Sequence, residues 1–561
     1  SRKGSPQPEI VIGRDSSLVA ATDTFQDGDL PQFYNADGQD LTTYLAQASG
    51  RTPEDFYSEV DWSQYQDTIW NTTRLNAGRK SDSSGGTQID GFVNMGSYAF
   101  LQVQASDIDF SAVETQESAL SWVDGLYSSI AEPDGVQKEF VRGVQSTGRQ
   151  LAREVRFGTQ NRTRWLNWMV GRSDYQQQSN RRETLDFASQ YAGVGERQFT
   201  FSDYQTEFET ARSSTFAGVA LRLSGLKLSH AVRNSSTRIT GTNTRSQYGN
   251  GEVIVDSYLD ELAPLTVAAT TFDRTDAGES SRSAVELQFG PNHLIYGAQI
   301  ETFKAGGQLG DALSAPYELL PETSEGEELG LQLHWAKFGL QLTSFDYTLL
   351  NLQSWDRGFS LLGERQLTAG NLDEAEVSGS ELRLYFKIAR FLQFQVQMAD
   401  LDAQVVAGSL PFIDGTGSVS YAGNRLAHAP EEQYGANLQI HFSRHVALSV
   451  SGRQRTGVYT SARNLPHTYI PEHSLTDARL IIQSADQGMR LTVYANNIDN
   501  TITWTDAINY SGINHGPFIN NAMGRTQTIT SQADDATANR QIALIQLAPP
   551  RTMGMQLDLR F

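Results

Sequence analysis

The feature that most constrains the fold of this chain is a strict alternation of apolar and polar side chains along paired segments joined by very short turns. Residues 434–442 are apolar at every even position, from Tyr434 to Phe442, and residues 446–450 repeat the pattern after a turn at 443–445. Successive side chains of a β-strand point to opposite faces of a sheet, so a period of two predicts strands. Further hairpins of this kind are predicted over residues 382–398, 329–344 and 216–228.

Long polar stretches separate these hairpins. They cover residues 400–432, 456–474 and 500–540. Short turns that alternate with long loops are typical of outer-membrane β-barrels, whose turns face the periplasm and whose loops face the exterior. A β-sandwich or a propeller does not normally show this asymmetry, and no fixed-period repeat is present. We therefore expect an all-β fold, a large antiparallel transmembrane β-barrel with short periplasmic turns and long extracellular loops.

Hydropathy agrees with a barrel in the bacterial outer membrane. The chain lacks an uninterrupted apolar run of the ~18 residues that a membrane-spanning helix needs, and its mean hydropathy is −0.42. These observations exclude a membrane protein built of helices. They do not exclude one built of strands, because a barrel strand exposes only every second residue to lipid.

The amino-acid composition excludes several kinds of functional site. Cysteine is absent, which excludes disulfide bonds, Cys-ligated zinc and thiol nucleophiles, and fits a passage through the oxidising periplasm. The 44 basic and 65 acidic residues give a net charge of −21, which argues against a nucleic-acid partner and mildly disfavours a strongly anionic ligand. Acidic solvated loops are the simplest interpretation of this charge. The chain begins at Ser1 without a signal peptide, so we read it as mature or trimmed.

The last residues form the sharpest single signal. Met555, Leu557, Leu559 and Phe561 share one face of a predicted strand, and the polar residues between them share the other. Outer-membrane barrels resemble this closely, with a closing strand whose terminal aromatic residue is read by the barrel assembly machinery. The resemblance makes Phe561 the assembly signal. The alternative, an ordinary edge strand, would leave a row of unpaired backbone groups exposed.

From about Arg153 onward, successive segments resemble landmarks of TonB-dependent receptor barrels, in the order of that family. For example, the segment from Gly423 to Glu431 reads GNRLAHAPE and is similar to a GNRLPNAPE pattern. The matching segments are Arg153–Phe157 with Trp165–Gly171, Leu294–Gly297 with Phe303–Gly307, Pro321–Thr323 with Glu328–Leu331, Ala375–Leu382, Gly423–Glu431 and Val493–Asn500. The resemblance implies a barrel of about 22 strands with a wide lumen.

The first part of the chain departs from this family. The family carries a TonB box and a glycine-rich plug domain before its barrel. Glu9, Ile10, Val11 and Ile12 resemble a TonB box, but no plug is recognisable. We therefore divide the chain into an N-terminal segment, residues 1–60, and a barrel, residues 61–561. Residues 61–150 are left open between early barrel strands and an eroded plug.

No catalytic, cofactor or metal site can be assembled from the sequence. Walker loops, nucleophile elbows, HExxH helices and complete EF-hand loops are absent. His467 and His473 could share a loop and a metal ion, but they are too far apart in sequence to predict such a site, and we interpret them as solvated loop residues. We expect no enzyme.

Three functions remain compatible with the sequence. The favoured one is a TonB-dependent outer-membrane receptor that takes up a scarce solute such as an iron chelate, cobalamin or a glycan. The second is a plug-less barrel that serves as a diffusion pore or as a scaffold for surface partners. The third and most remote is a surface hydrolase. The expected partners are outer-membrane lipid and lipopolysaccharide, the TonB complex if transport is energised, the assembly machinery, and a surface or periplasmic protein.

Overall fold

The computed structural model describes most of the chain. The described residues are 2–4, 9–13, 79–96, 98–117, 137–159, 165–190, 197–248, 266–309, 317–359, 365–411, 418–465, 468–485, 488–501, 503–509, 542–548 and 551–559. The predicted assembly signal Phe561 and the predicted boundary between residues 60 and 61 lie outside these ranges. Among the described residues, none forms a helix of the length and apolarity needed to cross a membrane.

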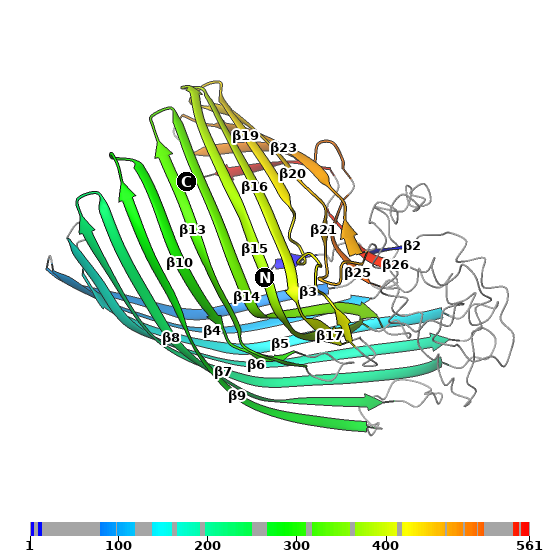
Figure 1. The fold of residues 1–561 in the computed structure, drawn as a ribbon. Helices are drawn as coiled ribbons and strands as arrows, with labels where there is room; N and C mark the ends of the chain where they lie inside the picture. Colours follow the sequence, from blue (N-terminus) through cyan, green and yellow to red (C-terminus); the bar gives the residue numbers. More distant parts are fainter. Residues whose placement is uncertain are drawn as a thin grey trace.

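An 18-stranded antiparallel sheet dominates the molecule (Figure 1). From β3 to β27, strands that are neighbours in the sheet also follow one another in the chain. This order is expected when segments with a period of two pair as hairpins. The strands are β1 (Arg2–Gly4), β3 (Arg79–Met95), β4 (Ala99–Glu117), β5 (Gln137–Gly158), β6 (Leu166–Gln190), β7 (Arg197–Leu223), β8 (Leu226–Tyr248), β9 (Thr266–Gln288), β10 (His293–Lys304), β13 (Glu322–His334), β14 (Phe338–Phe359), β15 (Arg365–Ala389), β16 (Leu392–Ala407), β19 (Glu432–His441), β20 (Val446–Arg455), β23 (His473–Gln483), β24 (Met489–Asn496) and β27 (Thr552–Leu559).

The structure confirms the hairpins predicted from the period of two. β19 pairs with β20, β15 with β16, β13 with β14, and β7 with β8. The last of these turns has only two residues, Ser224 and Gly225, between paired Leu223 and Leu226. Ser224 has a φ of 56°, in the left-handed region that two-residue hairpin turns require. The strand count of about 22 stays a prediction, because the described residues account for 18 strands of the sheet.

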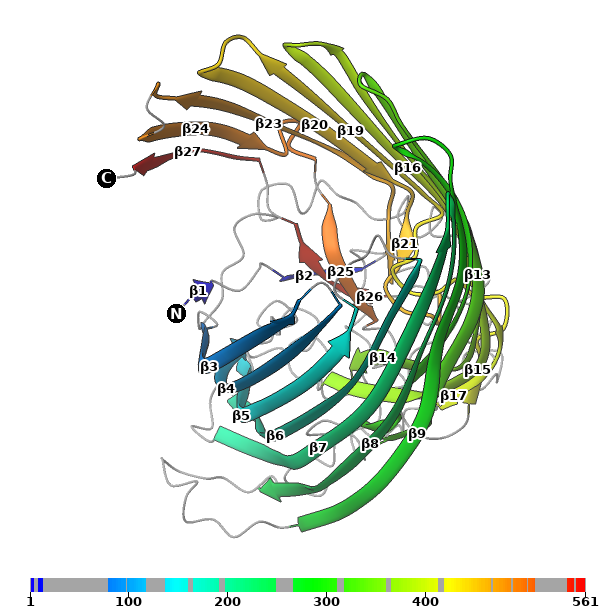
Figure 2. The same ribbon diagram turned by 90° about the vertical axis from the view of Figure 1, so that its left-hand side faces the viewer.

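The sheet curls into a curved wall, with its first strands and its last strand on the same side of the molecule (Figure 2). Within this curve lies a small three-stranded sheet of β2 (Glu9–Gly13), β26 (Ile542–Leu547) and β25 (Trp504–Asn509). Residues 79–95, 99–117 and 137–158 join the large sheet as β3, β4 and β5. The interior is therefore bounded by a continuous wall of strands from β3 to β27.

Connections at the two ends of the strands differ in length. The turns between β7 and β8, β13 and β14, and β15 and β16 cover residues 224–225, 335–337 and 390–391. At the other end, β16 and β19 are joined by residues 408–431, which include the short strands β17 (Ser409–Pro411) and β18 (Ser418–Ser420). The remaining short strands are β11 (Gly307–Leu309), β12 (Tyr317–Leu319), β21 (Val458–Tyr459) and β22 (Tyr469–Ile470). One end of the sheet is thus a turn end and the other a loop end.

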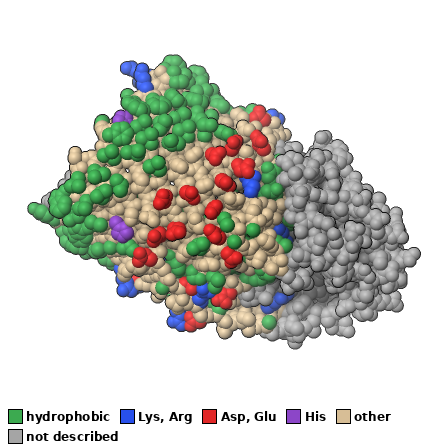
Figure 3. All heavy atoms as spheres, in the orientation of Figure 1, with side chains coloured by type: hydrophobic (Ala, Val, Ile, Leu, Met, Phe, Trp, Pro, Cys, Tyr) green, Lys and Arg blue, Asp and Glu red, His purple; other side chains and the backbone are tan. Residues whose placement is uncertain are grey.

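A band of exposed apolar side chains surrounds the turn end. Leu329 is 60% exposed and Leu342 41%, and the hydrophobic side chains gather toward the turns in Figure 3. A row of rings follows the turns: His293, Trp335, Phe338, Phe386 and Phe394, with neighbouring ring centroids 4.9–6.4 Å apart. Aromatic girdles mark the membrane interface of transmembrane barrels. The apolar band beside this girdle is the part of the wall that meets lipid.

The strands continue well beyond this band. β7 has 27 residues and β15 has 25, whereas about 9–11 residues are enough to cross the membrane. A hydrophobic cluster packs at the loop end around Leu372, Val405, Leu410, Tyr421 and Ala462. The loop end is therefore a packed structure that stands clear of the lipid-facing band.

Candidate functional site: an arginine-lined cavity in the lumen

The two faces of the sheet carry different side chains. In β14, Leu340 and Leu342 belong to the exposed apolar face, and Gln341 and Thr343 belong to the opposite face. Gln341 and Thr343 line a cavity together with Thr503, which lies next to β25 inside the curve of the sheet. The polar face of the wall therefore points into the lumen, as expected for a barrel with a water-filled interior.

This lumen cavity has a volume of about 830 Å³. Its wall is formed by β14, β15, β16, β19, β20 and β23, and its inner side by residues near β25 and β26. The chemically distinctive side chains in its lining are Glu381, Arg383, Gln397, Arg453, Arg455 and His473.

Strand register fixes how the arginines lie relative to one another. Arg383 of β15 is opposite Gln397, Gln397 is opposite Gly435, and Gly435 is opposite Arg453 of β20. Arg383 and Arg453 therefore occupy one row across the sheet, three strand steps apart. With about 4.8 Å per step, their backbones are roughly 14 Å apart. Arg455 follows Arg453 on the same face and is opposite Gln433 and His473.

These three guanidinium groups lack carboxylate partners within the part of the chain that the structure describes. No ion pair involves Arg383, Arg453 or Arg455, and the buried Nε of Arg455 has no hydrogen-bond acceptor among those residues. A buried donor without an acceptor costs free energy, which a ligand oxygen can recover. The planar fork of N–H donors on arginine suits carboxylates and phosphates, which it binds in bidentate fashion.

Further arginines face the lumen on β7, β8 and β9. Arg233 lies over the ring of Phe216, with 5.0 Å between the guanidinium carbon and the ring centroid. Some lumen-facing cations are neutralised: Lys227 binds Glu286 at 2.7 Å and Arg274 binds Asp276 at 2.8 Å. Those without a carboxylate partner among the described residues are Arg212, Arg222, Arg233, Arg245 and Arg282.

The lumen is thus richer in unpaired cations than the net charge of −21 suggests. The expectation that a strongly anionic ligand is disfavoured rested on this whole-chain sum, which adds charges from opposite faces of the wall. Exposed carboxylates such as Glu327 and Asp346 lie on the outer face, where they do not meet a solute inside the lumen. The charge that a solute meets in the cavity is positive.

The structure places the other residues singled out from sequence as follows. Glu9, Ile10, Val11 and Ile12 lie in β2, opposite residues 543–546 of β26. The interpretation of His473 as a solvated loop residue is wrong: it begins β23, is half-buried in the cavity wall, and its Nδ1 lies 3.0 Å from the carbonyl oxygen of Pro471. His467 lies outside the described residues.

The arginine cavity was missed by sequence reasoning, although a signal for it exists. Arg453 and Arg455 continue the polar positions of a strand whose apolar positions are Val446, Leu448 and Val450. Their phase in the period of two assigns them to the lumen. Sequence does not reveal that Arg383, 70 residues earlier, shares their row, because that depends on the register of three further pairings.

No metal site was found within the described residues, where no three His, Cys, Asp or Glu side chains lie close enough to hold an ion. The cavity holds one carboxylate and one imidazole, Glu381 and His473, on strands that are four steps apart in the sheet. Its donor set suits binding of an anion rather than coordination of a metal ion.

Comparison with known proteins was made by family and by fold. The model of the family described as TonB dependent receptor-like, beta-barrel, matches residues 13–500. The fold is similar to that of FyuA from Yersinia pestis, a ferric yersiniabactin uptake receptor, with a TM-score of 0.61 and 14% sequence identity over 88% of this chain and 63% of that chain. It is also similar to the ferric citrate transporter FecA in its unliganded form, with a TM-score of 0.55 and 13% identity over 89% of this chain and 64% of that chain. This chain therefore spans less than two thirds of the length of either structure. No curated protein sequence matches it.

Proposed function

Because this chain belongs to the TonB-dependent receptor-like β-barrel family of the outer membrane, we propose that it takes up a scarce solute in a process driven by the TonB complex. The family consists of transport receptors, and we propose no enzymatic activity. The exposed apolar band and the aromatic girdle support a barrel surrounded by outer-membrane lipid and lipopolysaccharide. Phe561 is proposed to guide its assembly, and residues 61–561 are proposed to form the barrel.

The observation that carries the proposal is the row of unpaired arginines in the lumen cavity. The backbones of Arg383 and Arg453 are roughly 14 Å apart on one face, and their long side chains reach into the cavity, so a solute with acidic groups on two sides can engage both. Among iron chelates, cobalamin and glycans, iron chelates with free carboxylates fit this requirement best. The two similar structures are named for ferric yersiniabactin and ferric citrate, which is compatible with an acidic chelate as the solute of this chain.

The segment Glu9–Ile12 is proposed to act as the TonB box. It forms β2, an edge strand of the small sheet, paired with β26 on one side. The other edge of β2 has no partner strand within the described part of the chain. An exposed strand edge offers backbone donors and acceptors to an additional strand, a common mode of peptide recognition.

Binding of ferric citrate to the purified full chain tests the solute class. We expect the triple variant R383Q/R453Q/R455Q to lose at least about tenfold in affinity, because each hydrogen bond to a charged group contributes on the order of 1.5–3 kcal/mol. The matched control is R172Q/R182Q/R238Q, which removes three outward-facing arginines. The proposal requires the control to bind as the native protein does. An equal loss in both variants would contradict an assignment to the lumen.

Conductance in a planar bilayer distinguishes energised uptake from the alternative functions. An occluded lumen gives no steady current, and uptake of the chelate then depends on TonB in cells. A large steady current from the native protein would contradict energised uptake and favour a diffusion pore. Chelate uptake that persists in cells without TonB would lead to the same conclusion.

A further inference from the structure

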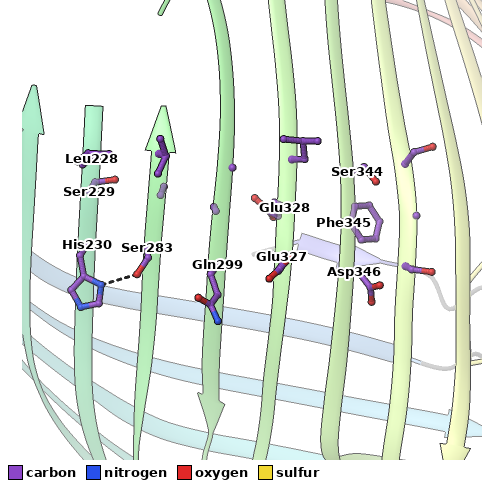
Figure 4. Close-up of a pocket in the computed structure, with 18 of the residues that line it drawn as sticks. Leu228, Ser229, His230, Ser283, Gln299, Glu327, Glu328, Ser344, Phe345 and Asp346 are labelled. Carbon is purple, nitrogen blue, oxygen red and sulfur yellow. Dashed lines mark hydrogen bonds between the residues drawn. The ribbon is translucent and has the colours of Figure 1, made fainter. Parts of the chain in front are cut away.

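A depression of about 1160 Å³ lies on the opposite face of the wall, across strands β7 to β16. Small residues form its floor, among them Gly297, Ser344 and Ser380. In Figure 4, the side chains of Gln299, Glu327 and Asp346 project in a row from β10, β13 and β14, and His230 is hydrogen-bonded to Ser283 at 2.9 Å. Carboxylate and amide side chains thus share this depression on the outer wall with apolar side chains such as Leu221, Leu228 and Leu329.

Strand register places this depression at the boundary of the lipid-facing band. Glu327 is the next outward residue after Leu329, and Asp346 is two outward positions beyond Leu342. Ser380 lies opposite both Ser344 and Asp400. Apolar side chains therefore border the depression on the turn side, and carboxylates border it on the loop side.

The carboxylates of this part of the outer wall are not neutralised by neighbouring cations. The exposed, outward-facing ones are Glu301, Glu325, Glu327, Asp346, Glu376, Asp400 and Asp402. None forms an ion pair with a described residue, and outward positions 295–303, 323–333, 338–350, 376–386 and 394–404 contain neither Lys nor Arg. Two pairs are directly opposite each other, Glu301 with Glu325 and Glu327 with Asp346. Like charges in that position destabilise a sheet.

Elsewhere on the outer wall, several carboxylates have an arginine partner within the sheet. Arg172 binds Asp174 at 3.0 Å, Arg182 binds Asp203 at 2.8 Å, and Arg238 binds Asp273 at 2.7 Å. The red side chains in Figure 3 gather over the part of the wall that lacks such pairs. The depression therefore extends over strands β10, β13, β14, β15 and β16, where the outward carboxylates have no Lys or Arg beside them among the described residues.

The negative charge of the depression limits which kind of molecule can bind there. Lipid tails cannot solvate carboxylates, and anionic lipid headgroups are repelled by them. A protein segment that presents lysine or arginine toward Glu327, Asp346 and Asp400 neutralises the like-charge pairs, and the floor of glycine and serine allows its backbone to approach closely. We propose that this depression is the docking site of a partner protein that binds the outer wall through a segment of alternating basic and small apolar side chains.

The test uses a fluorescent peptide of alternating lysine and alanine, with its binding to the purified full chain followed by fluorescence anisotropy. The triple variant E327Q/D346N/D400N is expected to lower affinity about tenfold or more. Ser380→Trp fills the floor and leaves every charge in place, and it is expected to weaken binding to a similar extent. The matched control E207Q/E209Q/E279Q removes three outward carboxylates of β7 and β9 and is expected to stay within about twofold of the native protein.

A photoreactive side chain at Ser380 in native outer membranes extends the test to the cell. We expect a protein adduct that disappears in E327Q/D346N/D400N and persists in the control. Folding is verified by heat-modifiable migration in gels, and neutralising exposed like charges is not expected to unfold the wall. Equal peptide binding by all variants would overturn the proposal. A second result would also overturn the proposal. If the photoreactive side chain formed adducts with lipid alone, and anionic vesicles bound only in the presence of Mg²⁺, the depression would be a lipid site.

Discussion

A buried ion pair at the loop end provides a sharp test of what holds the loops together. Asp356, in the part of β14 nearest the loop end, binds Arg463 in the connection between β20 and β23 at 3.0 Å, and the two side chains are only 3% and 5% exposed. Nε of Arg463 also donates to the hydroxyl of Tyr421, in the connection between β16 and β19, at 3.3 Å. One guanidinium group thus joins three segments that are distant in sequence.

Asp356→Asn is expected to destabilise this region strongly, because it leaves the buried charge of Arg463 without its counterion. Breaking a buried ion pair from one side costs about 3–5 kcal/mol. At about 1.4 kcal/mol per factor of ten, the local opening equilibrium should rise by about a hundredfold to a few thousandfold. Hydrogen exchange measured by mass spectrometry in residues 418–426 and 458–465 would report this change, while the strands of the apolar band should stay protected.

Two further variants test whether this ion pair stabilises the loops. The double variant D356N/R463M removes the buried charge altogether and should recover much of the protection. Glu431→Gln breaks the exposed pair with Arg425 and should cost less than about 1 kcal/mol, because solvent screens it. If D356N exchanges no faster than the native protein, or if D356N/R463M is no better than D356N, the pair does not hold the loops.

Three other outcomes follow from the wall and the loop cluster. Leu342→Arg on the lipid-facing side should cost up to about 2–4 kcal/mol in urea titrations of the barrel in lipid vesicles, whereas Gln341→Arg, one residue away on the lumen side, should cost little. Gly330→Ala should cost about 1–3 kcal/mol in the same assay because its methyl group would meet a tyrosine ring of β10, whereas Gly452→Ala has open space and should be neutral. Burial raises the pKa of Tyr421 from 10.0 to about 12. The contribution of the neutral hydroxyl to loop stability should therefore be complete below pH 10 and be lost as the pH rises toward 12. Hydrogen exchange in the loops of Tyr421→Phe should lack this pH dependence.

The fold was largely predictable because one repeated pattern encodes it. The alternation in residues 434–450 and 382–398 depends only on neighbours in sequence, and the structure confirms both hairpins. The family resemblance is confirmed by the model that matches residues 13–500. The strands and hairpin turns that depend on neighbouring residues could therefore be predicted from the sequence.

The site was not predictable in the same way. Arg383 and Arg453 share a cavity only because three successive registers align them, and Asp356 meets Arg463 only because the loops fold over the end of the sheet. Such contacts depend on long-range packing, for which a period of two carries no information. Whole-chain charge carries no information on the lumen for the same reason, since it does not distinguish the two faces of a strand.

The division of chemistry between the two faces has a consequence for how this protein can change over evolutionary time. Leu382 and Arg383 are adjacent in sequence, yet one faces lipid and the other the lumen. A gene that gains one codon within β15 shifts every following side chain of that strand to the wrong face, which places arginine in lipid and leucine in water. Gaining or losing two codons preserves the faces, and length changes within residues 408–431 leave the phase of the strands untouched. Insertions and deletions among descendants of this gene should therefore be even-numbered in strands and unrestricted in loops.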